Sequence, residues 1–299
     1  MLANIIKTCL PLSLMAVMFT QGLALKPGEL LAIFKDRPLV MLRSIFVVLV
    51  LVPIAALAII LLFKPSPATV VGLAILAASP AAPFQLRNIY KKGGSLVYLG
   101  ALHLSLALLA IITVPVVLDL LSKALGFHAE VSVFQVGKTV AETLLLPVAV
   151  GIVCGAVFPK VADRIDPTLG KIAEIGLYVM VILVLIKTSS LLLKMDVWSY
   201  VVMTIFIIVN FGLGHVLGPR DAQERTTLAM ESGARNFGLA LNIGVLNFSS
   251  ERALPVLIPY IILFAIISTL YLKWRARQTA TGKRSTKPAS SIVGSDEGS

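Results

Sequence analysis

The nine residues Met230–Gly238, MESGARNFG, place a glutamate, an arginine and an asparagine close to two glycines inside a stretch that is otherwise apolar. An earlier apolar stretch has a similar irregularity at Ala77–Gln85, AASPAAPFQ, where two prolines lie in its middle. Each proline removes a backbone donor and clashes with the carbonyl group four residues earlier, so the helix is predicted to break there. Charged side chains at membrane depth need a partner or water and are functional candidates. Two interrupted segments, one in each half of the chain, are typical of secondary transporters, whose binding sites lie at such breaks.

The composition of the chain predicts a membrane protein. Of its 299 residues, 58% are hydrophobic and 14% are charged, whereas a soluble domain is about 45–50% apolar and about 25% charged. Several uncharged stretches are as long as the roughly 20 residues needed to cross the hydrocarbon core of a bilayer. Backbone amides in lipid must be satisfied internally, so these stretches are predicted to be helices. The sequence therefore predicts an all-α, polytopic membrane protein in contact with the lipid bilayer.

Nine transmembrane helices are predicted from the hydrophobic segments. They cover residues of about 3–25, 40–63, 68–90, 95–122, 136–158, 172–193, 197–217, 226–246 and 253–273. If the first helix runs from outside to inside, about three times as many Lys and Arg residues lie on the cytoplasmic side as on the outer side, in accord with the positive-inside rule. This topology explains the net charge of +11, and no nucleic acid partner is expected.

The topology predicts a multi-pass protein of the inner (plasma) membrane, with its N-terminus outside and its C-terminus in the cytoplasm. Residues 1–278 would form the membrane domain, and residues 279–299, rich in Ser, Thr, Gly and Lys, a disordered cytoplasmic tail. A cleaved signal peptide is the alternative for the first segment, with Lys7 in its basic region. Its apolar run, Thr8 to Leu25, is longer than the usual 7–15 residues of such peptides.

No pattern for metal binding or catalysis stands out. The two cysteines, Cys9 and Cys154, lie in apolar segments, and the three histidines, His103, His128 and His215, stand far apart. An intramembrane enzyme would need a nucleophile with a base, or metal ligands at helical spacing such as His-Glu-x-x-His. We therefore expect no enzyme, no catalytic residues, no resident metal and no cofactor.

Four motifs resemble, in order and spacing, those of the bile acid:sodium symporter family, especially its bacterial members. Met18–Leu30 (MFTQGLALKPGEL) resembles the family's MFGMGLTLKPSDF, and Ser79–Ala82 (SPAA) stands where the family has CPGG. Asn210–Gly218 (NFGLGHVLG) resembles HNGIGYLLG, and Glu231–Ala240 (ESGARNFGLA) resembles EVGMQNSGLA. Bacterial relatives have ten helices, so this chain is expected to begin at the family's second helix.

The resemblance implies an inverted-repeat transporter fold with a panel domain and a core domain, the two interrupted helices crossing within the core. The panel would contain the helices at about 3–25, 136–158 and 172–193. The core would contain those at about 40–63, 68–90, 95–122, 197–217, 226–246 and 253–273. The resemblance also implies a secondary transporter that binds a small organic anion between core and panel and works by alternating access.

The candidate substrate- and ion-binding residues depart from the family's pattern. Glu231 and Asn236 are kept, but Arg235 stands where the family has a glutamine among its sodium ligands. The other family ligands are replaced by Val48, Gln85, Leu86, Leu99 and His103. The full set of candidates is Glu231, Arg235, Asn236, His103, Gln85, Ser79, Pro80 and Ser232.

Arg235 argues against sodium coupling, because a fixed guanidinium repels a sodium ion a few ångströms away in a low dielectric. Our main hypothesis is that Arg235 replaces the ion and pairs with Glu231. Transport would then be facilitated or coupled to protons, with Glu231 or His103 as the protonatable group. Two other roles stay open for Arg235, namely capture of a substrate carboxylate and an ion pair without a part in transport.

For the whole protein, two alternatives stay open: a sodium-coupled organic anion symporter, and a membrane sensor or structural protein without transport activity. The identity of the anion, the direction of transport and the oligomeric state do not follow from the sequence.

Overall fold

The computed structural model describes residues 2–80, 82, 95–129, 131–192, 195–247 and 250–285. Within these residues every regular element is a helix, which confirms the all-α prediction. The elements are α1 (Leu2–Ala24), α2 (Pro27–Asp36), α3 (Pro38–Phe46), η1 (Val47–Leu51), α4 (Val52–Phe63), α5 (Pro67–Ala78), α7 (Leu96–Leu125), α8 (Val133–Val140), η2 (Ala141–Leu145), α9 (Leu146–Val157), α10 (Pro159–Leu192), α11 (Val197–Val216), α12 (Ala222–Gly233), α13 (Phe237–Asn247) and α14 (Ser250–Ser285).

Five helices of the described part are long and apolar enough to cross a membrane. They are Pro38–Phe63, Leu96–Leu125, Val133–Val157, Val197–Val216 and Val256–Gln278. Thr8–Ala24 and Pro67–Ala78 are apolar but shorter. The long helices agree with the predicted segments within a few residues, whereas the count of nine membrane crossings stays a prediction.

Two of the long helices contain a π-helical turn that ends two residues before a proline. η1 precedes Pro53, and η2 precedes Pro147. Proline lacks an N–H group and clashes with the carbonyl four residues earlier. The wider turn adjusts the hydrogen-bond register at that point, so each helix passes its proline without ending.

The structure differs from the predicted segments in three places. The stretch between the predicted helices at about 3–25 and 40–63 contains α2, and α10 begins at Pro159 instead of near residue 172. α14 continues to Ser285, so part of the expected disordered tail is helical. Proline explains the early starts, because its preset φ and missing N–H suit the first turn of a helix; α2 begins at Pro27.

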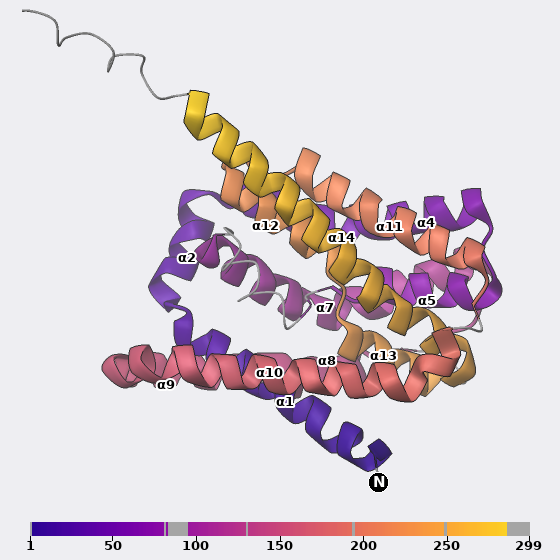
Figure 1. The fold of residues 1–299 in the computed structure, drawn as a ribbon, viewed down its shortest axis with the longest axis horizontal. Coiled ribbons are helices and arrows are strands. Elements are labelled where there is room, and N and C mark those ends of the chain that lie inside the picture. The colour runs from indigo at the N-terminus through magenta and orange to yellow at the C-terminus, as the bar shows by residue number, and fades with distance from the viewer. Residues whose placement is uncertain are drawn as a thin grey trace, which may run out of the picture.

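The helices form two layers (Figure 1). We call α1, α8–η2–α9 and α10 the lower layer; α1 packs along both α9 and α10. The upper layer contains α3–η1–α4, α5, α7 and α11–α14. Gly22 of α1 and Gly151 of α9 lie back to back, and a Cβ atom on either would meet a backbone carbonyl of the other helix. Small residues bring membrane helices into such close contact.

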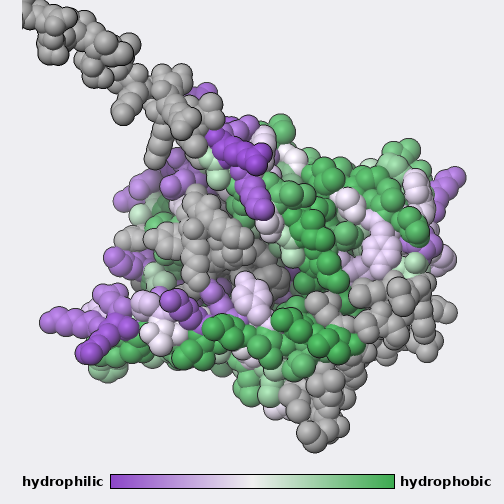
Figure 2. Space-filling view, viewed as in Figure 1, coloured by the Kyte–Doolittle hydropathy of each residue, from purple (hydrophilic) through white to green (hydrophobic). Residues whose placement is uncertain are grey.

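In Figure 2, hydrophobic side chains cover much of the described surface in the middle of the molecule, while hydrophilic ones gather at its left and upper left ends and, in a smaller group, at its right edge. The left and upper left ends contain α2 and the junction of α9 with α10 (Figure 1). The distribution is that of a protein whose middle lies in lipid and whose ends contact water.

Both predicted interruptions are present as far as the structure describes them. α5 ends at Ala78, and Ser79 and Pro80 are not helical. The second interruption lies at Ala234–Asn236, between α12 and α13. Pro83 and Gln85 lie outside the described residues.

Candidate functional site

The two interruptions meet in the interior of the upper layer. The backbone N–H of Asn236 donates a hydrogen bond of 2.9 Å to the carbonyl oxygen of Ser79. In a continuous helix that carbonyl would accept from residue 83, which is a proline and has no N–H. The break in one helix therefore provides the acceptor, and the break in the other provides the donor. Ser79 and Asn236 are both buried, as is Pro80.

Glu231, in the last turn of α12, pairs with a histidine of α7. Its Oε1 lies 2.9 Å from Nδ1 of His103. The carboxylate is 0% exposed and His103 is 1% exposed. Within the described residues, Oε2 of Glu231 and Nε2 of His103 have no hydrogen-bond partner. Each of the two groups therefore has one partner, and that partner is the other group.

The guanidinium of Arg235 folds back onto the end of α12. Its Nη2 donates to the carbonyl oxygens of Glu231, at 3.1 Å, and of Ser232, at 2.5 Å. The side chain is buried, with 3% of its surface exposed. The last carbonyls of a helix lack intrahelical partners and form the negative end of its dipole. Arg235 satisfies two of these carbonyls with a permanent positive charge.

The predicted pairing of Arg235 with the Glu231 carboxylate is wrong. Among the described residues, the ion pair of Glu231 is with His103, and Arg235 has none. The reason is the direction of the groups: the Glu231 side chain leaves α12 sideways toward α7, whereas its carbonyl points along the helix axis. The extended backbone after α12 carries Arg235 past the helix end, where the carbonyls are.

All four last carbonyls of α12 are satisfied. The N–H of Ala234 donates to Met230, Arg235 donates to Glu231 and Ser232, and the Tyr260 hydroxyl donates to Gly233 at 2.6 Å. Tyr260 is not among the site residues predicted from the sequence. A tyrosine in an apolar helix was the available signal, because a buried phenol usually finds a hydrogen-bond partner.

The side chain of Asn236 caps the next helix. Its Oδ1 accepts from the N–H of Leu239 at 3.0 Å, in the first turn of α13. Asparagine is among the preferred residues at this position. Both the backbone and the side chain of Asn236 are therefore used to hold the crossing together.

A polar row on α12 links this interior to the surface. Glu224, Thr227 and Glu231 are spaced so that they share one face of the helix. Glu224 pairs with Arg37, which raises the pKa of the Arg37 guanidinium chiefly through their hydrogen bond. Thr227 accepts from the N–H of Ser95 at 3.1 Å. This row is not among the features predicted from the sequence, because its partners lie far away in the chain.

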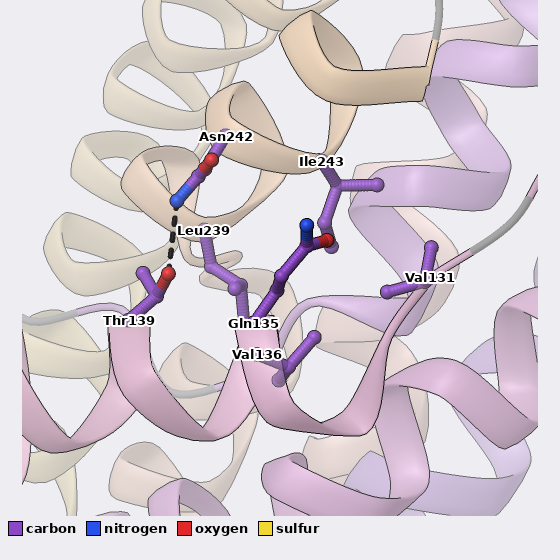
Figure 3. A pocket seen from close by; sticks show the side chains of 7 residues that line it. All are labelled: Val131, Gln135, Val136, Thr139, Leu239, Asn242 and Ile243. Carbon is purple, nitrogen blue, oxygen red and sulfur yellow. Dashed lines mark hydrogen bonds between the residues drawn. The ribbon is translucent and has the colours of Figure 1, made fainter.

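A small crevice lies between the two layers, where α8 faces α13 (Figure 3). Nδ2 of Asn242 donates to Oγ1 of Thr139 across it at 2.9 Å. Gln135 contributes a third polar side chain, and four apolar ones complete the lining: Val131, Val136, Leu239 and Ile243. The crevice has a volume of about 10 Å³, enough for one water molecule.

The structure thus brings seven of the eight sequence-predicted candidates to the crossing. His103, Ser79, Pro80, Glu231, Ser232, Arg235 and Asn236 lie there, and Gln85 lies outside the described residues.

A family model described as the sodium bile acid symporter family matches residues 11–195. The match includes the first interruption and His103 and ends before α11, so that Glu231 and Arg235 lie beyond it. A comparison with curated proteins finds no match.

Proposed function

Because the chain belongs to the sodium bile acid symporter family, we propose that it is a secondary transporter that carries a small organic anion. Members of this family are transporters of organic anions, and the long apolar helices make the chain a multi-pass membrane protein. The proposal includes nine crossings of the inner (plasma) membrane, with the N-terminus outside.

The proposed mechanism is alternating access, with the lower layer as the panel and the upper layer as the core of an inverted-repeat fold. The bond between Thr139 and Asn242 joins the two layers on the α13 side of the crossing. A transporter that opens toward that side has to separate these residues. The anion would bind where the layers face each other.

We further propose that transport does not need sodium. The observation that carries this proposal is the guanidinium of Arg235 on the carbonyl oxygens of Glu231 and Ser232. Carbonyls at the end of an interrupted helix are typical ligands of sodium in transporters. A permanent cation on them repels a second one. Arg235 then acts as a built-in replacement for the ion, through main-chain oxygens of Glu231.

If sodium is not the coupling ion, a proton can take its place, and we propose that the Glu231–His103 pair carries it. Both groups are buried within the core and share one hydrogen bond. Movement of the core would expose the pair first to one side of the membrane and then to the other. Facilitated transport without any coupling ion is the alternative within this proposal.

The test is uptake into proteoliposomes. A screen of organic anions in detergent first identifies a substrate, since a ligand that binds the native state raises its melting temperature. Uptake of that anion is then measured with sodium or potassium outside, and with and without a proton gradient. We expect equal uptake in the two salts and faster uptake with a proton gradient. A steep rise of uptake with external sodium would refute the sodium-independent mechanism.

One observation favours sodium-coupled symport as a second candidate. Near the end of α12, three buried oxygens have no hydrogen-bond partner among the described residues: Oε2 of Glu231, Oγ of Ser232 and Oδ1 of Asn210. Ser232 lies against Gly214, one helical turn from Asn210. Oxygen atoms of this kind are the ligands that hard cations prefer. The comparison of uptake in sodium and potassium distinguishes the two candidates.

A further inference from the structure

A second, unrelated feature of the upper layer is a groove on its surface between α11 and α14. It is lined on one side by Ile208, Gly212 and Val216, and on the other by Ile267, Leu270 and Trp274. Its volume is about 320 Å³, within the range of ligand pockets. A Cβ atom on Gly212 would meet nothing within 4 Å, so the absence of a side chain there keeps the groove open.

One end of the groove is aromatic. Nδ1 of His215 and the hydroxyl of Tyr271 lie 2.9 Å apart within the lining. The ring of Trp274 stands beside both. Aromatic rings with polar tips are enriched at the level of the lipid headgroups. This end of the groove therefore has the character of a membrane interface, and the other end is apolar.

Cationic side chains follow at the aromatic end. Arg225 and Arg275 lie close enough for their charges to act on His215. Arg277 follows Trp274 by three residues and Leu270 by seven, and so continues the row of groove residues on α14. Nε of Arg225 donates to the carbonyl of Pro219, and among the described residues its two Nη groups have no partner. In Figure 2, hydrophilic side chains lie at the upper end of α14, next to a hydrophobic area farther down the helix.

We propose that this groove binds an anionic phospholipid, with an acyl chain between α11 and α14 and the phosphate at Arg225 and Arg277. An apolar groove with cations at one end complements an amphiphile with an anionic head. Arginine donates to phosphate through several parallel hydrogen bonds, and basic residues next to a membrane helix attract anionic lipids. This proposal needs only a membrane-embedded chain, so it stands apart from the transport mechanism.

The test uses the full-length protein, purified and delipidated in a neutral detergent. Phosphatidylglycerol is added, and phosphatidylcholine with the same acyl chains in parallel. Bound lipid is counted by native mass spectrometry and the melting temperature is recorded. We expect one phosphatidylglycerol to bind and to raise the melting temperature, and phosphatidylcholine to do neither.

Variants locate the site. Arg277→Gln and Arg225→Gln should each weaken phosphatidylglycerol binding about fivefold, as removal of one basic group near a membrane does. Gly212→Leu should abolish binding by filling the groove. Gly28→Leu is the matched control, because a Cβ atom on Gly28 also meets nothing within 4 Å. Lys123→Gln removes an exposed positive charge elsewhere, from α7. If Arg225→Gln fails to fold because the bond to Pro219 is lost, the effect of Arg277→Gln on phosphatidylglycerol binding shows whether cations at this end bind the phosphate.

Three results would overturn the proposal. The first is equal binding of the two lipids, which would indicate unspecific coating of the apolar surface. The second is phosphatidylglycerol binding that survives Gly212→Leu. The third is a dimer in delipidated protein that Gly212→Leu dissociates, because a second copy of the chain would then occupy the groove.

Discussion

At the scale of single residues, the chemistry of the crossing depends mainly on Arg235. It contributes a permanent charge where two carbonyls at the end of α12 need a partner. Leaving a buried polar group without a partner costs about 1–3 kcal/mol. A shorter neutral side chain would therefore leave α12 with acceptors that a mobile cation can occupy.

The first prediction concerns Arg235→Gln. We expect the variant to be less stable by a few kcal/mol, and sodium to restore part of its melting temperature because the ion then binds the freed oxygens. Uptake should become sodium-dependent. The measurements are melting curves and proteoliposome uptake in sodium against potassium salts.

Arg235→Lys is the control for this prediction, since it retains the charge and should remain sodium-independent. Other outcomes assign Arg235 a different role. If Arg235→Gln loses affinity for the anion without gaining a response to sodium, Arg235 binds the substrate. If transport is unchanged, the contacts of Arg235 are purely structural.

His103 is the residue whose role the structure changed most. In the sequence it is a lone histidine in an apolar segment, and its candidacy came only from the position it shares with a family ligand. In the structure it is the partner of Glu231, which lies 128 positions away. Sequence periodicity cannot predict such a pair, because nothing local in α7 indicates which side chain of another helix will face His103.

At the scale of the elements, helix ends explain several of the polar contacts of the upper layer. α11 begins after Asp196, whose Oδ1 accepts from the N–H of Ser199 at 2.8 Å and whose Oδ2 accepts from the Ser199 hydroxyl at 2.7 Å. These bonds lower the pKa of the Asp196 carboxyl. The charged form of Asp196 is therefore favoured in the folded protein.

The second prediction follows from this cap. The pKa of Asp196 is lower in the folded chain than in the unfolded one. Its contribution to the free energy of unfolding is therefore complete above the unfolded pKa of about 3.9, and it is lost as the pH falls through the folded pKa. At neutral pH, Asp196→Ala should cost about 1 kcal/mol. That deficit should shrink in acid, as followed by melting curves of both proteins across the pH range.

The control for the cap is Asp196→Asn, which can cap the helix without a charge. The free energy of unfolding of this variant should lack the contribution of the Asp196 charge that is lost in acid. A deficit of Asp196→Ala that stays constant from neutral to acid pH would show that the charge of Asp196 contributes nothing to the cap.

At the scale of the whole molecule, the two layers are the units that have to move in the proposed mechanism. Within the upper layer, Thr69 donates to the Ser199 hydroxyl at 2.6 Å, joining α5 to α11. Between the layers, Asn242 donates to Thr139, joining α13 to α8. Alternating access requires the contact between the layers, Asn242–Thr139, to break. The contact within the upper layer, Thr69–Ser199, can persist.

The third prediction tests this difference with cross-links. Cysteines replace Thr139 and Asn242 in a protein whose native Cys9 and Cys154, both free, are changed to serine. Oxidation should stop uptake into proteoliposomes, and a reducing agent should restore it, because the disulfide holds the layers together.

A cysteine pair at Thr69 and Ser199, within one layer, is the matched control and should leave uptake unchanged after oxidation. Uptake that continues with the Thr139–Asn242 cross-link complete, as verified by mass spectrometry, would contradict movement of the layers against each other.

The fold class, the places of the long helices and the two interruptions followed from the sequence, because they depend on local properties. Hydrophobic length decides which segments enter lipid, and prolines and glycines decide where a helix breaks. Only the tertiary structure decided that Glu231 faces His103, that Arg235 bonds main-chain carbonyls and that α11 and α14 leave a groove between them. These features depend on how helices from distant parts of the chain pack and on which way each side chain leaves its helix.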